Sequence, residues 1–187
     1  MHNRRYGRRV GMGDDLVAFV LARLDEDEQF ARLAIAKQDD AVWRSDVALV
    51  SSPRTFWIRS ARDSRPIAVV QDLAGDHPDD TTGILGGSAA AHIARHDPAR
   101  VLAEVAAKRQ LVQRYQLCEA ENERNVRLYD EWEAAGGSEF GDGAVPDDPA
   151  ARLRETSPLE AEGLWLAVRY LAAVHAEHPD YRRAWKP

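Results

Sequence analysis

The chain has 187 residues, of which 44% are hydrophobic and 30% are charged, so it can bury the core of one domain. Its formal net charge of −6 argues against non-specific nucleic-acid binding, because attraction to phosphate dominates such binding. The single cysteine, Cys118, excludes an intramolecular disulfide and indicates the reducing cytoplasm, and no apolar run reaches the roughly 18–20 residues of a membrane helix.

The N-terminus differs in composition from the rest of the chain. Residues 1–11 contain no acidic residue and hold four arginines: Arg4, Arg5, Arg8 and Arg9. One interpretation is a disordered extension upstream of a true start at Met12, and the other is a basic arm that binds nucleic acid. In both cases we expect a single helical domain over residues 12–187.

Residues 14–38 are predicted to form the first helix. Apolar residues recur there at spacings of three and four, which places them on one helix face. They are Val17, Val20, Leu21, Leu24, Ala31, Ala34 and Ile35. Asp14 is the expected N-cap, because its short side chain can accept a hydrogen bond from a free backbone amide.

Two short β-prone runs flank a polar turn that ends at Pro66, one from Thr55 to Ile58 and the other from Ile67 to Val70. This pattern predicts a β-hairpin over about residues 54–72. A lone hairpin is only marginally stable, so it must pack on the helices or gain a third strand, for which residues 46–50 are the candidate. Residues 74–87 are rich in Gly, Asp and Pro and are predicted to form a loop.

Two consecutive helices are predicted in the middle of the chain. Ser88 is expected to cap a short helix over residues 88–96, and Asp97 is expected to cap the next one, which starts at Pro98 and runs to about residue 135. A helix of this length would protrude, pair with the first helix, or break near residues 119–122. Its apolar stripe begins with Val101, Leu102, Val105, Val112, Tyr115 and Cys118.

The last part of the chain predicts a flexible linker and a final helix. Residues 136–156 are rich in glycine and proline, and a capping box from Ser157 to Glu160 then begins a helix that reaches about residue 176. Four residues of this helix are expected to face the core, with either Trp165 or Val174 at the margin: Leu164, Val168, Leu171 and Ala172. Together these elements predict a mainly α (α+β) fold, a bundle of three to four helices with a small β-hairpin.

Two pairs of histidines are candidate metal ligands. His92 and His96 are four residues apart, which places both imidazoles on one helix face, and His175 and His178 form a second pair at the end of the last helix. If the fold brings the pairs together, the four side chains would make a zinc site, with a hydrolase as one use of it. The alternative is that His96, His175 and His178 bond the free carbonyl groups of helix C-termini.

The chain offers little support for nucleophilic catalysis. Cys118 lies on a predicted helix beside Glu119 and Glu121, whose charges would raise rather than lower the pKa of its thiol. The sequence has no Gly-x-Ser-x-Gly motif. The glycine-rich stretch from Gly83 to Ser88 precedes a helix start and could hold an anion, but it lacks the lysine of a phosphate-binding loop. The sequence therefore favours a protein without enzymatic activity.

Basic residues form three local groups that could contact nucleic acid. Besides the N-terminal arginines they are Lys108, Arg109 and Arg114 in the long helix, and Arg182, Arg183 and Lys186 near the C-terminus. The last group alternates with Tyr181 and Trp185, a composition that can stack bases. The alternative, which the acidic total favours, is that Tyr181 and Trp185 pin the tail onto the helices.

A role in protein interaction accounts for the remaining features. The helices carry many apolar residues for so small a chain, and the apolar stripe of the long helix is hard to cover with one partner. We therefore expect a protein partner or a homodimer.

Four segments of the sequence resemble a family of uncharacterised actinobacterial and actinophage proteins, a domain of unknown function. They are residues 91–109 (AHIARHDPARVLAEVAAKR), 178–187 (HPDYRRAWKP), 14–19 (DDLVAF) and 24–28 (LDEDE). The segment from Gly136 to about Leu153 fits the resemblance poorly and is expected to be an insertion. The resemblance implies an actinobacterial or phage-linked origin, but it brings no activity, ligand or catalytic residue with it.

Overall fold

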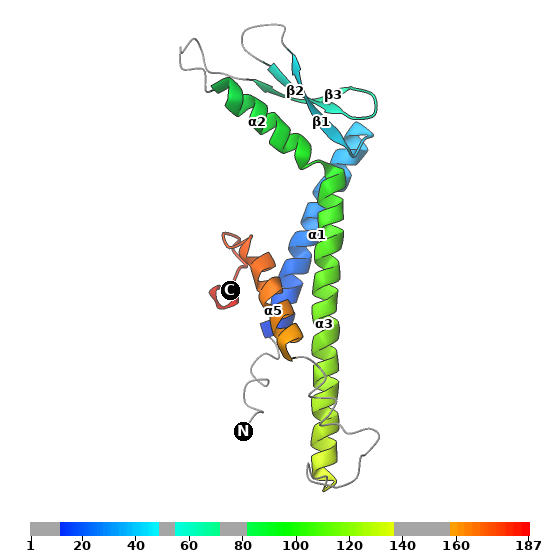
Figure 1. The fold of residues 1–187 in the computed structure, drawn as a ribbon, viewed down its shortest axis with the longest axis vertical. Helices are drawn as coiled ribbons and strands as arrows, with labels where there is room; N and C mark the ends of the chain where they lie inside the picture. Colours follow the sequence, from blue (N-terminus) through cyan, green and yellow to red (C-terminus); the bar gives the residue numbers. More distant parts are fainter. Residues whose placement is uncertain (1–11, 49–54, 72–81, 137–157) are drawn as a thin grey trace. The chain divides into compact units, whose positions relative to one another are not determined.

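The fold is mainly α-helical with one small antiparallel sheet, as predicted. The computed structural model describes residues 12–48, 55–71, 82–136 and 158–187 (Figure 1). Its elements are α1 (Met12–Gln38), β1 (Trp43–Ala48), β2 (Thr55–Ser60), β3 (Pro66–Gln71), α2 (Thr82–Arg95), α3 (Pro98–Ala134), α5 (Pro158–Ala173) and the 3₁₀ helix η1 (Arg183–Trp185). The expected N-terminal extension (1–11) and nearly all of the expected linker (136–156) lie outside the described residues.

The chain groups into two compact units. Unit 1 consists of Met1–Ala22 and Lys108–Pro187, and unit 2 is the continuous segment Arg23–Ala107. Helices α1 and α3 each contribute to both units. The expectation of one domain over residues 12–187 stays a prediction.

The sheet of unit 2 contains the predicted hairpin and a third strand. Its strand order is β1-β2-β3, and both pairings are antiparallel. The register pairs Phe56 with Val70 and Ile58 with Ala68, and a bulge follows Ile58. The side chains of β2 alternate between buried and half-buried, as expected when only one face of a sheet is covered. The third strand covers Trp43–Ala48 and so begins three residues before the expected segment.

Helix α2 covers the buried face of this sheet (Figure 1). Ala90 and Ala94 pack there against Phe56 and Ile58. The helix begins at Thr82, so the prediction of a loop through residue 87 and of a cap at Ser88 was wrong. Each glycine costs a helix about 1 kcal/mol, which favoured the loop, but burial of the following turns on the sheet outweighs this preference. The glycine-rich stretch is therefore not a loop in front of a helix.

Asp97 caps α3 as predicted. Its carboxylate accepts hydrogen bonds from the backbone amides of Arg100 (2.8 Å) and Trp43 (3.3 Å). The amide of Ala99 also donates to the carbonyl of Ala41 at 2.9 Å, so the start of α3 is fixed to the chain that enters β1. The helix then continues to Ala134 without the break considered near residues 119–122.

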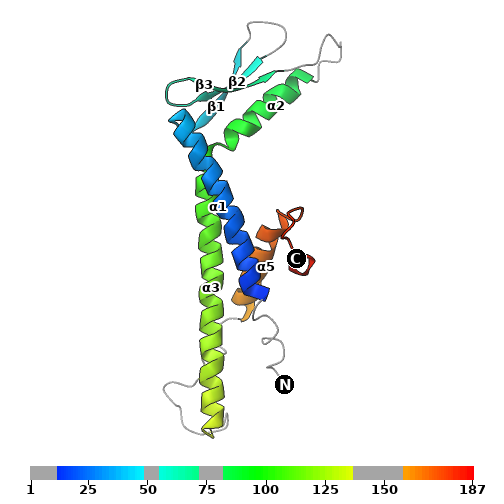
Figure 2. The ribbon, with the colours of Figure 1, turned by 180° about the vertical axis from the view of Figure 1, so that it is seen from behind.

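Unit 1 is built on the first part of α1 as far as Ala22, on α3 from Lys108 onward and on α5 (Figure 2). The rings of Tyr115 on α3 and Trp165 on α5 are 5.8 Å apart, and α1 contributes buried residues from its first two turns. Asp14 is not the N-cap, because α1 begins at Met12 and places this acid in its first turn, where the helix dipole favours it. The buried hydrophobic residues of the three helices in this unit are Leu16, Val17, Phe19, Val20, Val112, Tyr115, Cys118, Ala161, Trp165, Val168 and Ala172.

Candidate interaction surface

The two histidine pairs fall into different compact units. His92 and His96 belong to unit 2, are exposed, and have ring centroids 4.5 Å apart. His175 and His178 belong to unit 1 and lie 6.4 Å and 5.7 Å from the ring of Phe19. Over the described ranges, no three or more metal-ligating side chains gather in a group that could hold an ion. The shared zinc site stays a prediction.

Cys118 is a buried free thiol on α3. Burial is the main cause that raises the pKa of this thiol, and the carboxylates of Glu160 and Glu121 add to the effect, which Arg114 opposes. The direction agrees with the prediction from the sequence. The main cause differs, because the sequence shows the neighbouring acids and not the burial.

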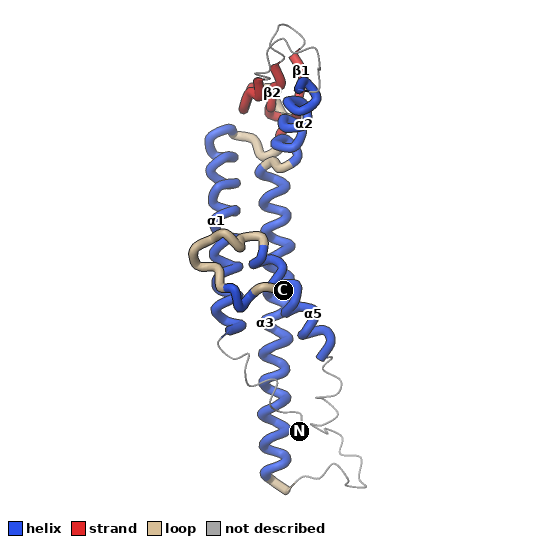
Figure 3. Tube along the Cα trace, turned by 90° about the vertical axis from the view of Figure 1, so that its left-hand side faces the viewer, coloured by secondary structure: helices blue, strands red, loops and turns tan. Residues whose placement is uncertain are grey.

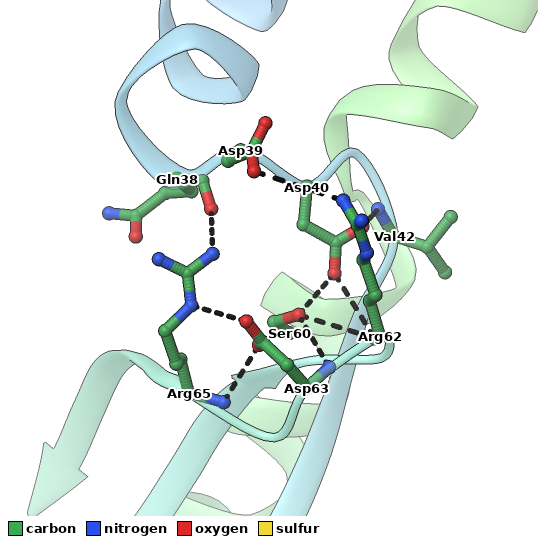
Figure 4. A network of polar contacts seen from close by, with 8 residues as sticks. All are labelled: Gln38, Asp39, Asp40, Val42, Ser60, Arg62, Asp63 and Arg65. Carbon is green, nitrogen blue, oxygen red and sulfur yellow. Dashed lines mark hydrogen bonds and ion pairs between the residues drawn. The ribbon is translucent and has the colours of Figure 1, made fainter.

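The polar network at the turn between β2 and β3 joins this turn to the end of α1 (Figure 4). The buried hydroxyl of Ser60 donates to the carboxylate of Asp40 and accepts from the backbone amides of Arg62 and Asp63. The guanidinium of Arg65 donates to the carbonyl of Gln38 at 2.8 Å. Each of these contacts joins residues of unit 2, so we assign the network to the stability of that unit.

This network predicts an acid-sensitive contribution to stability. The hydrogen bond from Ser60, followed by backbone hydrogen bonds from Val42, Arg62 and Ala41, lowers the pKa of Asp40 from 3.8 to about 2. A carboxyl whose pKa is lower in the folded state stabilises the fold above its ordinary pKa and loses this effect as the pH falls through the folded value. We expect Asp40→Asn to reduce the melting temperature at pH 7 and to flatten its decline between about pH 4 and pH 2.

Thermal unfolding followed by circular dichroism at a series of pH values measures this effect. Asp39→Asn is the matched control, because Asp39 is the adjacent acid, and its carboxylate is exposed and lies 3.8 Å from Arg62. If the melting temperature falls equally steeply with decreasing pH in wild type and in Asp40→Asn, the role given to Asp40 is contradicted.

The C-terminal tail packs on α1 of unit 1, where Figure 3 shows it as a loop after α5. Trp185 is only 2% exposed, and its ring lies 5.1 Å from Phe19 and 5.9 Å from Tyr181. The carbonyl of Trp185 accepts a hydrogen bond from Arg169 on α5 at 3.1 Å. The interpretation that Tyr181 and Trp185 pin the tail onto the helices is confirmed.

Two of the basic residues proposed for nucleic acid, Arg182 and Arg114, form ion pairs with acids. Arg182 pairs with Asp15 at 2.5 Å and lies 5.3 Å from the ring of Trp185, and Arg114 pairs with Glu160 at 2.6 Å. The N-terminal arginines lie outside the described residues. Nucleic-acid binding through the chain ends stays a prediction. The ion pairs of Arg182 and Arg114 leave these two guanidinium groups less available to phosphate than the sequence suggested.

Helix α5 has an apolar face that points away from the core. Ala161, Trp165, Val168 and Ala172 are buried on the inner side. On the opposite side, Leu166, Tyr170 and Val174 are 40%, 60% and 79% exposed. These three residues, which we call the outer stripe, recur every fourth residue and therefore lie in one row along the helix, which ends at Ala173, one residue before Val174. The helix carries only three charged residues in 16: Glu160, Glu162 and Arg169.

The outer stripe is not where the sequence placed the spare apolar surface. That surface was expected on the long helix, where Val105, Val112, Tyr115 and Cys118 are buried. On the same helix Val101 and Leu102 are half-buried and Leu117 is exposed. Trp165 and Val174 were the two candidates for the margin of the core-facing side of α5. Trp165 is buried and Val174 is exposed, so Trp165 belongs to that side. Leu166 and Tyr170 were not predicted from the sequence, although their spacing and the scarcity of charge in this helix indicate a second apolar face.

A second exposed apolar pair occurs in unit 2 on α1. Phe30 and Leu33 are 71% and 49% exposed. They lie beside charged residues of the same helix, and Arg32 and Glu28 form an ion pair there. A shallow depression of about 520 Å³ on this helix has a mainly apolar wall, although four of its six lining residues are polar or charged: Asp25, Glu28, Gln29 and Arg32, beside Leu33 and Ala36. The outer stripe, which has no charge within it, is the better candidate for an apolar interface.

Comparison with known proteins gives one match. A family model described as a family of unknown function (DUF6221) matches residues 13–187. No curated protein and no solved structure matches the chain. No described helix is long and apolar enough to cross a membrane.

Proposed function

The chain belongs to this family of unknown function, and we propose that it is a non-enzymatic interaction protein that binds a protein partner through the outer stripe of α5. The observation that carries this proposal is that α5 is apolar on two opposite faces, of which one packs inside unit 1. A helix that is hydrophobic all round is normally buried all round. The outer stripe therefore fits a surface that a second molecule covers.

The energetics favour the same assignment. Burial of apolar surface contributes about 25 cal/mol per Å², and a row of Leu, Tyr and Val offers such surface without any charge that would have to lose its water. Tyr170 adds an aromatic ring with a hydroxyl at its tip. Tyrosine is enriched in interfaces because its ring can be buried at the centre while its hydroxyl contacts water at the rim. Scattered single apolar residues need no partner, whereas a continuous row supports one.

The other parts of the proposal rest on the sequence and on one buried side chain. The buried Cys118, whose pKa is raised, is unsuited to act as a nucleophile, which supports a non-enzymatic role. A single cysteine suits the cytoplasm. The resemblance of residues 91–109 and 178–187 supports an origin in an actinobacterium or its phage. Zinc binding by His92, His96, His175 and His178 is the alternative function, supported by the closeness of the His92 and His96 rings.

The proposal predicts that a photo-crosslinking residue at position 170 captures a protein. We expect a benzoylphenylalanine at Tyr170, introduced in the cells that produce the protein, to give one discrete adduct of higher mass on irradiation. Tyr170 is 60% exposed, so the change leaves the core of unit 1 intact. Gel electrophoresis followed by mass spectrometry of the adduct measures the result.

Gln116 is the matched control for this experiment. It is exposed on α3 in the same unit and lies outside the outer stripe, so the same residue at position 116 should give no discrete adduct. The proposal fails if position 170 gives no adduct, or if positions 116 and 170 give the same adducts.

A further inference from the structure

The exposed side of α2 carries a pair of histidines opposite the side that packs on the sheet. Ala90 and Ala94 are buried in the contact with the sheet, whereas His92 and His96 are exposed. At 3.6 residues per turn, each histidine lies about half a turn around the helix from the two alanines. The backbone amide of His96 donates to the carbonyl of His92 at 3.1 Å, so the helical turn continues through both residues. The packing of α2 therefore presents both imidazoles to solvent on one side of the helix.

We infer that His92 and His96 form a two-ligand site for a divalent transition-metal ion of right-angle geometry, Cu²⁺ before Ni²⁺, with water at the remaining coordination positions. Neutral imidazole is a ligand that both ions accept. This inference goes beyond the proposed function and does not depend on it. It also differs from the shared zinc site, because both of its ligands belong to unit 2.

The separation of the two rings indicates the geometry of the ion. Metal–nitrogen bonds of roughly 2.0–2.1 Å place an ion about 3.2 Å from each ring centre, so two bound rings have centres about 4.5 Å apart at a right angle and about 5.2 Å apart at the tetrahedral angle. The ring centroids of His92 and His96 are 4.5 Å apart. Square-planar and octahedral ions hold adjacent ligands at a right angle, whereas zinc in proteins is usually tetrahedral. The pair therefore fits Cu²⁺ or Ni²⁺ better than Zn²⁺, and Cu²⁺ is the tighter binder of the two.

The surroundings of the pair indicate a moderate affinity. Helix α2 ends at Arg95, so the two imidazoles lie at its C-terminal end, where free carbonyl groups favour a cation. The exposed guanidinium of Arg95 has the opposite effect. Among the described residues, no third metal-ligating side chain forms a group with the pair. We therefore expect a dissociation constant on the order of 10 μM for Cu²⁺, which is much weaker than the binding of zinc to a complete structural site.

Isothermal titration calorimetry of the full chain with Cu²⁺ tests the site. Every protein carries His2→Ala and no affinity tag, because a histidine beside the amino terminus chelates copper by itself. We expect one Cu²⁺ to bind with this constant. Binding should be at least about tenfold weaker in His92→Ala and in His96→Ala, because each variant loses a second ligand that is held at high effective concentration. Zn²⁺ should bind at least about tenfold more weakly than Cu²⁺.

A double variant controls for the number of histidines. Ala91→His combined with His96→Ala keeps two histidines at exposed positions of α2 but makes them adjacent in sequence. Neighbouring residues of a helix do not face each other, so this pair cannot share one ion. We expect its affinity for Cu²⁺ to be as low as that of His96→Ala alone.

A second double variant separates this site from the shared zinc site. We expect His175→Gln combined with His178→Gln to bind Cu²⁺ as wild type does, because both residues belong to unit 1. These two side chains lie near Phe19, so thermal unfolding first establishes that the variant is folded at the temperature of the titration.

Hydrogen–deuterium exchange locates the ion in the fold. A bound ion holds positions 92 and 96 in the helical conformation and stabilises the folded state. We expect exchange in residues 90–96 to slow when Cu²⁺ is added, while exchange in α5 stays unchanged. In His96→Ala the same addition should leave residues 90–96 unaffected.

Four results would overturn the inference. Wild-type affinity in His92→Ala and His96→Ala would place the ion elsewhere. Wild-type affinity in the variant with adjacent histidines would mean that their spacing has no role. Zinc binding as tight as copper binding would contradict the right-angle geometry. Weaker copper binding in the folded variant without His175 and His178 would support the four-histidine site instead.

Discussion

Replacing Trp185 with alanine is expected to lower the free energy of unfolding of unit 1 by about 3–5 kcal/mol, the range observed when a buried Trp is truncated. The indole is 2% exposed and lies against Phe19 and Tyr181, so alanine would leave a cavity between α1 and the tail. We expect the tail to lose its contact with α1 at the same time. Hydrogen–deuterium exchange should then show faster exchange in residues 178–187 and in the first turns of α1.

Two variants test whether volume or hydrogen bonding causes this loss. The indole nitrogen of Trp185 is buried and has no hydrogen-bond partner in the structure, so Trp185→Phe loses no hydrogen bond and should cost less than alanine. Lys186→Ala, at the adjacent exposed position, should change stability by less than about 0.5 kcal/mol. A Trp185→Ala protein as stable as wild type would show that the tail is not part of the core.

Replacing Ile58 with alanine is expected to lower the stability of unit 2 by about 2–5 kcal/mol. Ile58 is fully buried on the central strand and packs with Phe56, Ala90 and Ala94 between the sheet and α2. The loss combines the removed apolar area and the cavity that a three-stranded sheet cannot easily close. Chemical denaturation measures the size of the effect, and hydrogen exchange should locate it in β2 and α2.

Val69 offers a matched control on the neighbouring strand. It is also β-branched, but it is paired with Trp57, lies on the other face of the sheet and is 42% exposed. We expect Val69→Ala to cost well under half as much as Ile58→Ala, because less buried area is lost. Equal losses at the two positions would mean that both faces of the sheet are covered.

The parts of the fold that could be predicted from the sequence are those that local chemistry determines. The spacing of Val17, Val20 and Leu24 on α1 predicted a buried stripe, and all three are buried. Asp97 followed by Pro98 predicted the start of α3, and its carboxylate does cap the helix. The start of α2 could not be predicted, because its glycines favour a loop locally and the contact with the sheet is a tertiary effect.

The candidate site was harder to predict for the same reason. Phe19 lies outside the apolar spacing assigned to the first helix, and it is buried because Trp185, which is 166 positions later in the chain, packs against it. Leu166 and Tyr170 belong to an apolar helix whose two faces look alike in sequence. Only the packing of Trp165 and Val168 into unit 1 shows which face is left outside.

The order of the two units along the chain has a consequence for biosynthesis. Unit 2 is continuous and is inserted between the two parts of unit 1. A ribosome therefore completes residues 23–107 before it has made any of residues 108–187, and domains fold during synthesis as their segments emerge. Phe19 is made before residues 23–107, yet the rings that pack against it, Tyr181 and Trp185, are made after them. Until translation supplies the tail, this ring has to be shielded from water by chaperones or by temporary contacts.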